Sequence, residues 1–286
     1  MPRWISKALA VGPGMVVSTV LTWMVGALLP PLPGLALFVG GLMALALLLL
    51  GRGERVAARV LYRAHPLSEE EQAALAPALT LLCSGQLGPP LVQMWVCSSD
   101  RRAVAEAVGR RTVVVAVGVL DALQDGRLNP AQAAAVIGHA AALVRDGWVR
   151  HDLAIAYWSL PWLTLRAIAH GLSATVGRLP LIALAWRLRI VLVTIAVVQA
   201  VQQGWPWVAA MLGVLGAVSY AIPVWERRWD TLLLTAGDTA LLAGGLAAPW
   251  ASVLRRHTMT PRIRRRLRTL EPLPTALASL ALVTRD

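Results

Sequence analysis

No charged residue occurs between Ala8 and Gly51, and this run most constrains what the chain can fold into. Prolines interrupt the run in its middle, at Pro30, Pro31 and Pro33. Leu9 to Leu29 reaches ~30 Å as a helix, the thickness of the hydrocarbon core of a bilayer. The sequence therefore predicts an N-terminal transmembrane hairpin. A cleaved signal peptide is the alternative, but a second apolar helix follows at once and no small-residue cleavage site precedes a polar domain.

A second charge-free run extends from Ile190 to Trp225 and is interrupted by Gln202 to Pro206. It predicts a second hairpin, whose first helix begins as early as Leu181. Neither turn carries a charge, whereas basic residues flank both hairpins. These are Arg3, Lys7, Arg52, Arg55 and Arg59 around the first hairpin and Arg187, Arg189, Arg227 and Arg228 around the second. By the positive-inside rule, we expect a multi-pass protein of the plasma membrane with both termini and the intervening segment in the cytoplasm.

Composition supports a membrane protein and excludes two other classes. Of the 286 residues, 57% are hydrophobic and 15% charged, whereas soluble domains carry about 25% charge. Such a chain is neither an ordinary soluble protein nor a disordered one. Its net charge of +12 flanks apolar runs instead of forming one basic stripe, so the expected partner is the lipid bilayer and not nucleic acid.

Four segments follow from this pattern. Residues 1–59 form the first hairpin, residues 60–180 the first part of a cytoplasmic domain, residues 181–225 the second hairpin, and residues 226–286 a helical part that completes the domain.

Short β-branched runs and helix-start signals indicate a compact α+β domain between the hairpins. Leu91 to Cys97 and Thr112 to Val117 predict strands, and the polar, arginine-rich stretch from Ser98 to Arg111 predicts a loop between them. Two helix starts carry capping boxes. In a capping box, the side chain of the N-cap residue accepts a hydrogen bond from the backbone N–H three residues later, and the side chain of that later residue accepts one from the backbone N–H of the N-cap. The two boxes are Ser68 with Glu71, and Asn129 with Gln132, where Pro130 takes the first helical position and the helix runs to about Asp146.

The segment from Leu153 to Val176 is apolar but contains Arg166, His170 and an interior Pro161. A third membrane segment would give an odd number of crossings and break the positive-inside pattern. We therefore favour an interfacial or packed helix with Trp158 and Trp162 at headgroup level.

Four stretches in fixed order resemble one family. They are Val119 to Leu123, Ala135 to Asp146, Glu226 to Asp230, and Arg262 to Leu267. Together with the two hairpins, they resemble the HtpX-like membrane zinc metallopeptidases, which include the CAAX prenyl proteases. The resemblance covers nearly the whole chain and implies a zincin-like domain.

The resemblance assigns roles to five positions. In the family, a helix carries His-Glu-x-x-His, whose two His bind zinc and whose Glu activates water. A later helix supplies a third ligand in a Glu-x-x-Ala-Asp pattern. His139 matches the first His and Glu226 the third ligand, with Asp230 four residues later. The catalytic Glu is replaced by Ala140 and the second His by Leu143.

These replacements predict that no catalytic residue, cofactor or metal site remains. Catalytic zinc uses three protein ligands, and only His139 and Glu226 survive. Asp146 lies ~10 Å along the helix from His139, too far to share one ion. His139 is then expected either to pair with Glu226 in the former zinc cavity or to bond a backbone carbonyl.

The sequence thus predicts a mostly α membrane protein with two transmembrane helical hairpins around a zincin-like α+β cytoplasmic domain. Its expected function is that of a catalytically inactive metallopeptidase-like protein that binds a polypeptide or a membrane-protein partner. Binding would proceed by strand addition at the strand from Thr112 to Val117 or its neighbour. The alternative is an active membrane zinc metalloendopeptidase with a non-standard site. A transporter is disfavoured because no charge lies inside the hairpins.

Overall fold

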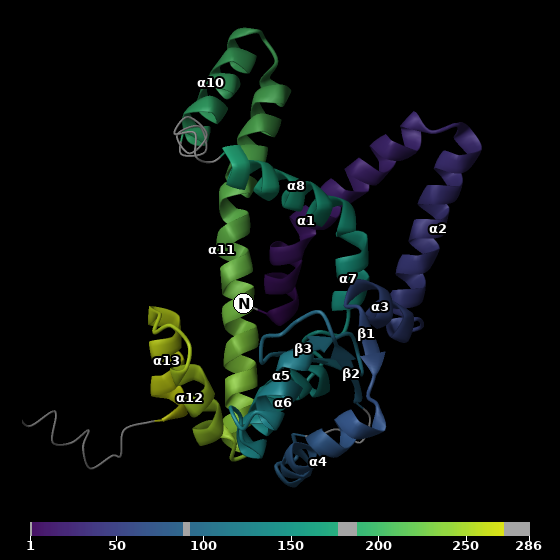
Figure 1. Ribbon diagram of the computed structural model, residues 1–286. Helices are drawn as coiled ribbons and strands as arrows, with labels where there is room; N and C mark the ends of the chain where they lie inside the picture. The colour runs from purple at the N-terminus through teal and green to yellow at the C-terminus, as the bar shows by residue number, and fades with distance from the viewer. Residues whose placement is uncertain (1, 88–91, 177–187, 272–286) are drawn as a thin grey trace, which may run out of the picture. The chain divides into compact units, whose positions relative to one another are not determined.

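The computed structural model describes residues 2–87, 92–176 and 188–271, and these fall into two compact units (Figure 1). The first unit comprises residues 1–46 and 154–231, and the second comprises residues 47–153 and 232–286. The sequence placed the divisions at residues 59, 180 and 225. Each unit is described by itself.

The first unit is helical. Its elements are α1 (Arg3–Leu28), α2 (Pro31–Leu49), α7 (Asp152–Trp158), α8 (Leu160–Val176), α10 (Arg189–Gln202) and the first part of α11 (Pro206–Ala243). Three of them, α1, α2 and α11, are long and apolar enough to cross a membrane. The described part of α10 has 14 residues, and residues 181–187 of the expected second hairpin lie outside the described residues.

The segment from Leu153 to Val176 packs against α1. It forms two helices, α7 and α8, with Pro161 in the first turn of α8, where a missing N–H is tolerated. Trp158 Nε1 donates a hydrogen bond to Thr19 Oγ1 at 2.9 Å, and the backbone N–H of Trp162 donates to Ser18 Oγ at 3.2 Å. These contacts agree with the expectation of a packed helix.

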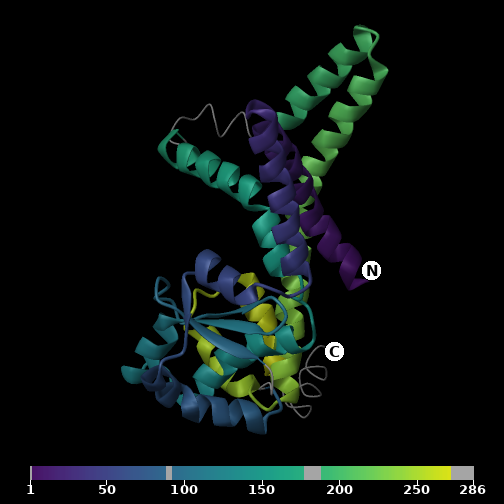
Figure 2. The ribbon, with the colours of Figure 1, turned by 90° about the vertical axis from the view of Figure 1, so that its right-hand side faces the viewer.

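The second unit contains a four-stranded mixed sheet of β1 (Ala64–Pro66), β2 (Gln93–Cys97), β3 (Ala105–Val108) and β4 (Thr112–Ala116), visible in Figure 2. The strand order is β1-β2-β4-β3, in which β2 and β4 are parallel and the outer pairs are antiparallel. The two predicted strands are confirmed as β2 and β4. Of the two strands expected to accept a polypeptide, Thr112 to Val117 or its neighbour, β4 is an interior strand and its neighbour β3 lies at an edge. The edges are β1 and β3, and β3 lies inside the stretch that was expected to be a loop.

Helices cover both faces of the sheet, α3 (Glu54–Leu61) on one face and α4 (Glu69–Ser84), α5 (Val117–Gln124) and α6 (Pro130–Arg145) on the other. The second unit also contains the end of α11, α12 (Ala247–Arg255) and α13 (Pro261–Leu270), and α12 packs on α6 and α13. Val96, Val113 and Val115 point to the face that α4 and α6 cover, whereas Trp95 and Val114 alternate to the face that α3 covers. Because β4 is buried on both faces, its sequence is continuously apolar and not alternating.

Both predicted capping boxes are confirmed. Ser68 Oγ accepts from the backbone N–H of Glu71, whose carboxylate accepts from Ser68 N–H. Asn129 and Gln132 exchange the same pair of bonds at the start of α6. Each box satisfies two backbone donors that the first helical turn leaves unpaired. The second box fixes where α6 begins, and therefore which of its residues enter the core.

Candidate functional site

α6 places His139 in the interior of the second unit. Its alanine-rich sequence favours a helix and offers small side chains to the sheet beneath it. The His139 side chain is 12% exposed, and Ala140 and Leu143 are buried in the apolar core. Neither buried neighbour offers an atom that binds metal or accepts a proton.

The carboxylate beside His139 belongs to Asp238 of α11. His139 Nε2 lies 3.6 Å from Asp238 Oδ1, just beyond hydrogen-bond distance, and the Asp238 side chain is 5% exposed. Among the described residues, His139 Nε2 has no hydrogen-bond partner. Gly237 permits this approach, because a Cβ atom there would lie 2.3 Å from His139 Nε2.

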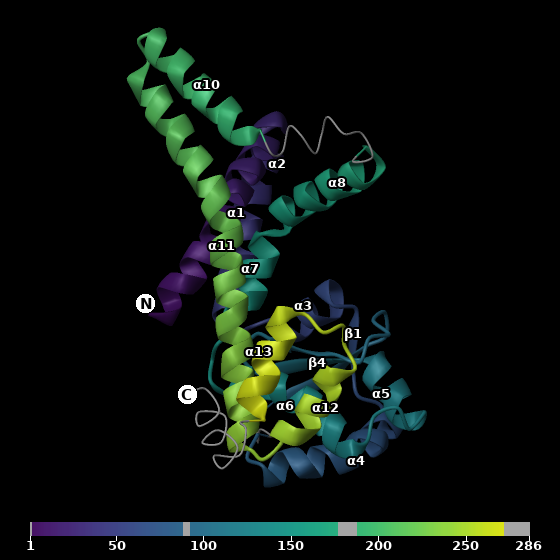
Figure 3. The ribbon, with the colours of Figure 1, turned by 90° about the vertical axis from the view of Figure 1, so that its left-hand side faces the viewer.

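Asp238 is held by side chains of α12 and α13, two further helices of the same unit whose ribbons Figure 3 shows. Arg266 of α13 donates from Nε to Oδ2 at 2.7 Å and from Nη2 to Oδ1 at 2.6 Å. Trp250 of α12 donates from Nε1 to Oδ1 at 2.8 Å, and its ring centroid lies 5.2 Å from that of His139. α12 packs on both α6 and α13. Asp238 thus joins four helices at one point.

Asp238 stays ionised in this setting. Burial would raise the pKa of its carboxyl group, but the hydrogen bonds from Arg266, the neighbouring His139, the positive charge of Arg266 and the Trp250 N–H lower it to about 2. The charge-free part of α11 ends at Trp225, so Asp238 lies outside the apolar span. A bidentate pair of this kind is directional and strong, because the guanidinium matches the carboxylate geometry.

The other residues that the resemblance singled out lie elsewhere. Glu226, the expected partner of His139, instead forms an ion pair with Arg166, at 3.0 Å between Oε1 and Nη1. Asp230 is exposed on α11. Asp146 follows the last residue of α6 and pairs with Arg145 at 2.9 Å. The expected pair of His139 with Glu226 is therefore wrong, and the carboxylate nearest to His139 Nε2 is that of Asp238, at 3.6 Å.

The residues around His139 do not fit zinc. A catalytic site needs three protein ligands and an open position. Here both Asp238 oxygens already accept hydrogen bonds, and the Arg266 guanidinium balances the charge of the Asp238 carboxylate. Across the described ranges, no group of three or more His, Cys, Asp or Glu side chains is placed to hold a metal ion.

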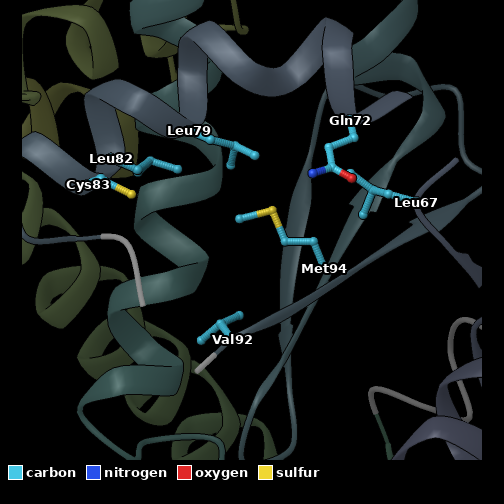
Figure 4. Close-up of a pocket in the computed structure, with 7 residues that line it drawn as sticks. All are labelled: Leu67, Gln72, Leu79, Leu82, Cys83, Val92 and Met94. Atoms are coloured by element: carbon cyan, nitrogen blue, oxygen red, sulfur yellow. The ribbon is translucent and has the colours of Figure 1, made fainter. Parts of the chain in front are cut away.

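An apolar hollow of about 340 Å³ opens between α4 and the sheet (Figure 4). Leu79 and Leu82 of α4 face Met94 of β2 across it, and Gln72 and Cys83 add the polar atoms. Leu82 also contacts α6, since a Cβ atom at Gly138 would lie 2.8 Å from its Cδ2 atom. The described lining residues are mostly apolar, so the hollow suits an apolar side chain.

Comparison with known proteins gives no match: no protein family, curated protein or solved structure is similar to the chain at a significant level.

Sequence reasoning missed Asp238, Trp250 and the role of Arg266. One signal was present, because Gly237-Asp238 places a glycine and a lone acid inside an otherwise apolar helical stretch. A buried acid in such a stretch needs a partner, and a glycine beside it marks a close approach.

Proposed function

We propose that this chain is a catalytically inactive, metallopeptidase-like membrane protein that binds an extended polypeptide. The observation that carries the first half is the buried pair of Asp238 and Arg266 beside His139. An ion pair stands where a metal would be needed, and Ala140 has no group to activate water. The fold is then kept for binding.

The placement of Asp238 changes how the chain aligns with the metallopeptidase pattern. With Asp238 as the final Asp of Glu-x-x-Ala-Asp, the Ala position falls on Gly237 and the Glu position on Leu234. All three ligand and base positions other than His139 are then apolar, namely Ala140, Leu143 and Leu234. This register replaces the one that used Glu226 and Asp230.

The membrane arrangement belongs to the same proposal. Three helices have the length and composition to span, and we propose that α10, a shorter apolar helix, belongs to a fourth span. Two hairpins then leave the second unit and both termini on the cytoplasmic side of the plasma membrane, because the basic residues flank that side.

The binding half of the proposal rests on β3. On the β3 side of β4, the backbone N–H of Ala116 donates to Val104 O. On the β2 side, the carbonyl group of Arg111 accepts from the backbone N–H of Gln93. In an antiparallel pair, every second residue of a strand directs its backbone N–H and C=O groups toward the partner strand, and the residues between them direct these groups away. Ala105 and Ala107 therefore direct their N–H and C=O groups away from β4, and no strand among the described residues pairs with that edge. β3 also packs on α6, the helix that carries His139.

A proline substitution in this edge strand tests the binding. Ala107→Pro removes an outward N–H and leaves the β3–β4 ladder intact. A photoreactive benzoylphenylalanine at the exposed position 106 should give a polypeptide adduct in cells. We expect Ala107→Pro to abolish the adduct and Ala107→Ser, which keeps the N–H, to preserve it. An adduct that survives Ala107→Pro, in protein with an unchanged melting temperature, contradicts strand addition.

Metal content and proteolysis test the loss of catalysis. The purified full chain should hold well under one zinc per molecule and should not cleave unfolded casein when zinc is supplied. Stoichiometric zinc that disappears in His139→Ala, together with cleavage, would establish the alternative of an active zinc metalloendopeptidase.

A further inference from the structure

A hollow of about 410 Å³ opens between the start of α3 and the sheet, within the second unit. One side of its lining comes from Gly51 in the turn after α2 and from Glu54 and Arg55 at the start of α3. The other side comes from Gln93 of β2 and Arg111, which directly precedes β4. Its volume falls in the range of small-ligand sites, which is ~300–1,000 Å³. The proposed peptide edge at β3 does not include these residues.

The hollow is positively charged. Glu54 is the one carboxylate among its described lining residues, and Glu54 Oε1 already accepts from the backbone N–H of Arg110 at 2.9 Å. Arg55 Nε donates to Gln93 Oε1 at 3.3 Å, which leaves the rest of its guanidinium for another acceptor. In the described part of the chain, no carboxylate pairs with the exposed Arg111. Two guanidiniums therefore line the hollow, and this hydrogen bond of its carboxylate, Glu54, comes from the backbone of Arg110 and from neither of them.

Arg110 has a separate role in the same place. Its Nη2 atom donates to the backbone carbonyl of Leu49, the last residue of α2, at 2.6 Å. A cation at a helix C-terminus satisfies an unpaired carbonyl and the helix dipole. Arg110 is thus used to end α2, whereas Arg55 and Arg111 remain for a ligand.

The position of the hollow along the chain indicates which anion it meets. Gly51 follows α2 by two residues, and α2 is one of the helices able to cross a membrane. The residues directly after a span lie at headgroup level, where anionic lipid phosphates are concentrated. Guanidinium groups bind phosphate oxygens through paired N–H donors.

We propose that this hollow is a binding site for the phosphate headgroup of one anionic lipid, held by Arg55 and Arg111. The proposal depends on α2 crossing the bilayer and is independent of the polypeptide-binding function. Inorganic phosphate shares the chemistry but lacks the acyl chains that keep a lipid beside α2.

Native mass spectrometry of the full chain in neutral detergent tests the site. Phosphatidylglycerol should bind at one molecule per chain, phosphatidylcholine should not, and millimolar inorganic phosphate should not displace the bound lipid. Arg55→Gln with Arg111→Gln should weaken phosphatidylglycerol binding about tenfold or more, since two charge-assisted contacts are lost. Arg264→Gln with Arg265→Gln removes the same charge from exposed positions of α13 and should change the affinity less than about twofold.

Equal weakening in both double variants would show adsorption by net charge and overturn the proposal. Equal binding of phosphatidylcholine, or displacement by inorganic phosphate, would overturn the assignment to an anionic lipid. A second variant avoids removing the arginines: Val56→Glu puts a carboxylate on the exposed lining of the hollow and should abolish phosphatidylglycerol binding. Unchanged binding in Val56→Glu would also refute the site.

Discussion

The ring of His139 lies against the backbone of Gly237, so closely that a Cβ atom at position 237 would sit 2.3 Å from Nε2. α6 and α11 therefore approach each other at a point where neither can gain volume. A Cβ–N distance this short requires one helix to move or the imidazole to leave its position.

Gly237→Ala should destabilise the protein by roughly 1–3 kcal/mol, because the added methyl group overpacks a buried contact. Gly213→Ala in the same helix is the control. Nothing lies within 4 Å of a Cβ atom there, so the better helix propensity of alanine should leave the melting temperature equal or higher. Adding His139→Ala to Gly237→Ala should recover part of the loss. A Gly237→Ala melting temperature equal to that of the parent would contradict the close contact.

Arg266→Gln should cost about 3–5 kcal/mol, because it leaves the Asp238 carboxylate buried without its cation. The matched control is Arg127→Gln. Arg127 and Asp125 form an exposed pair, with side chains 63% and 60% accessible, so their loss should change stability by about 0–1 kcal/mol. Denaturant unfolding of the detergent-solubilised protein measures both. Similar small effects for the two variants would mean that the Asp238 pair does not hold α13 in place.

The pKa of Asp238 predicts how stability depends on pH. Its folded value of about 2 lies below the ordinary value of 3.8, so ionised Asp238 favours the folded state. This contribution, roughly 2 kcal/mol, is fully present above about pH 4 and is lost as the pH falls from about 4 to about 2. The melting-temperature difference between the parent and Asp238→Asn should therefore shrink in that range. A difference that stays constant from pH 6 to pH 2 would rule out titration of Asp238.

The revised register with the metallopeptidases predicts which substitutions rebuild a zinc site. Ala140→Glu, Leu143→His and Leu234→Glu together should bind zinc with His139, since three ligands would then face one another. Ala140→Glu with Leu143→His alone should not, because the third ligand would be absent. Elemental analysis of both variants decides between the registers. Zinc in the double variant that is lost on Glu226→Gln would restore Glu226 as the third ligand.

Local signals made much of the fold predictable. Ser68 with Glu71 and Asn129 with Gln132 mark helix starts through bonds that span three residues. The runs that became β2 and β4 are rich in β-branched residues, which favour strands. In contrast, β3 reads Ala-Glu-Ala-Val and β1 reads Ala-His-Pro, so neither has strand propensity of its own. Pairing with β4 and β2 makes them strands, and pairing is not visible in a short sequence.

The candidate site was predictable only in part. The helix that carries His139 followed from its cap, and the absence of an acid at Ala140 and of a second His at Leu143 followed from the sequence alone. The partner did not, because Asp238 lies 99 residues from His139 and the choice between it and Glu226 depends on how the helices pack. Glu226 matched a spacing, but Arg166 is the residue it meets.

The second unit is built from two stretches of chain, residues 47–153 and 232–286, and residues 154–231 of the first unit are encoded between them. A ribosome therefore delivers His139 well before Asp238, Trp250 and Arg266. At ~5–20 residues per second the interval lasts several seconds, during which the apolar surface of α6 that α12 later covers has no partner. Folding of this unit must wait until Arg266 has been synthesised. A chain truncated before Arg266 would leave Asp238 without its cation, which makes such products natural targets for chaperones and proteases.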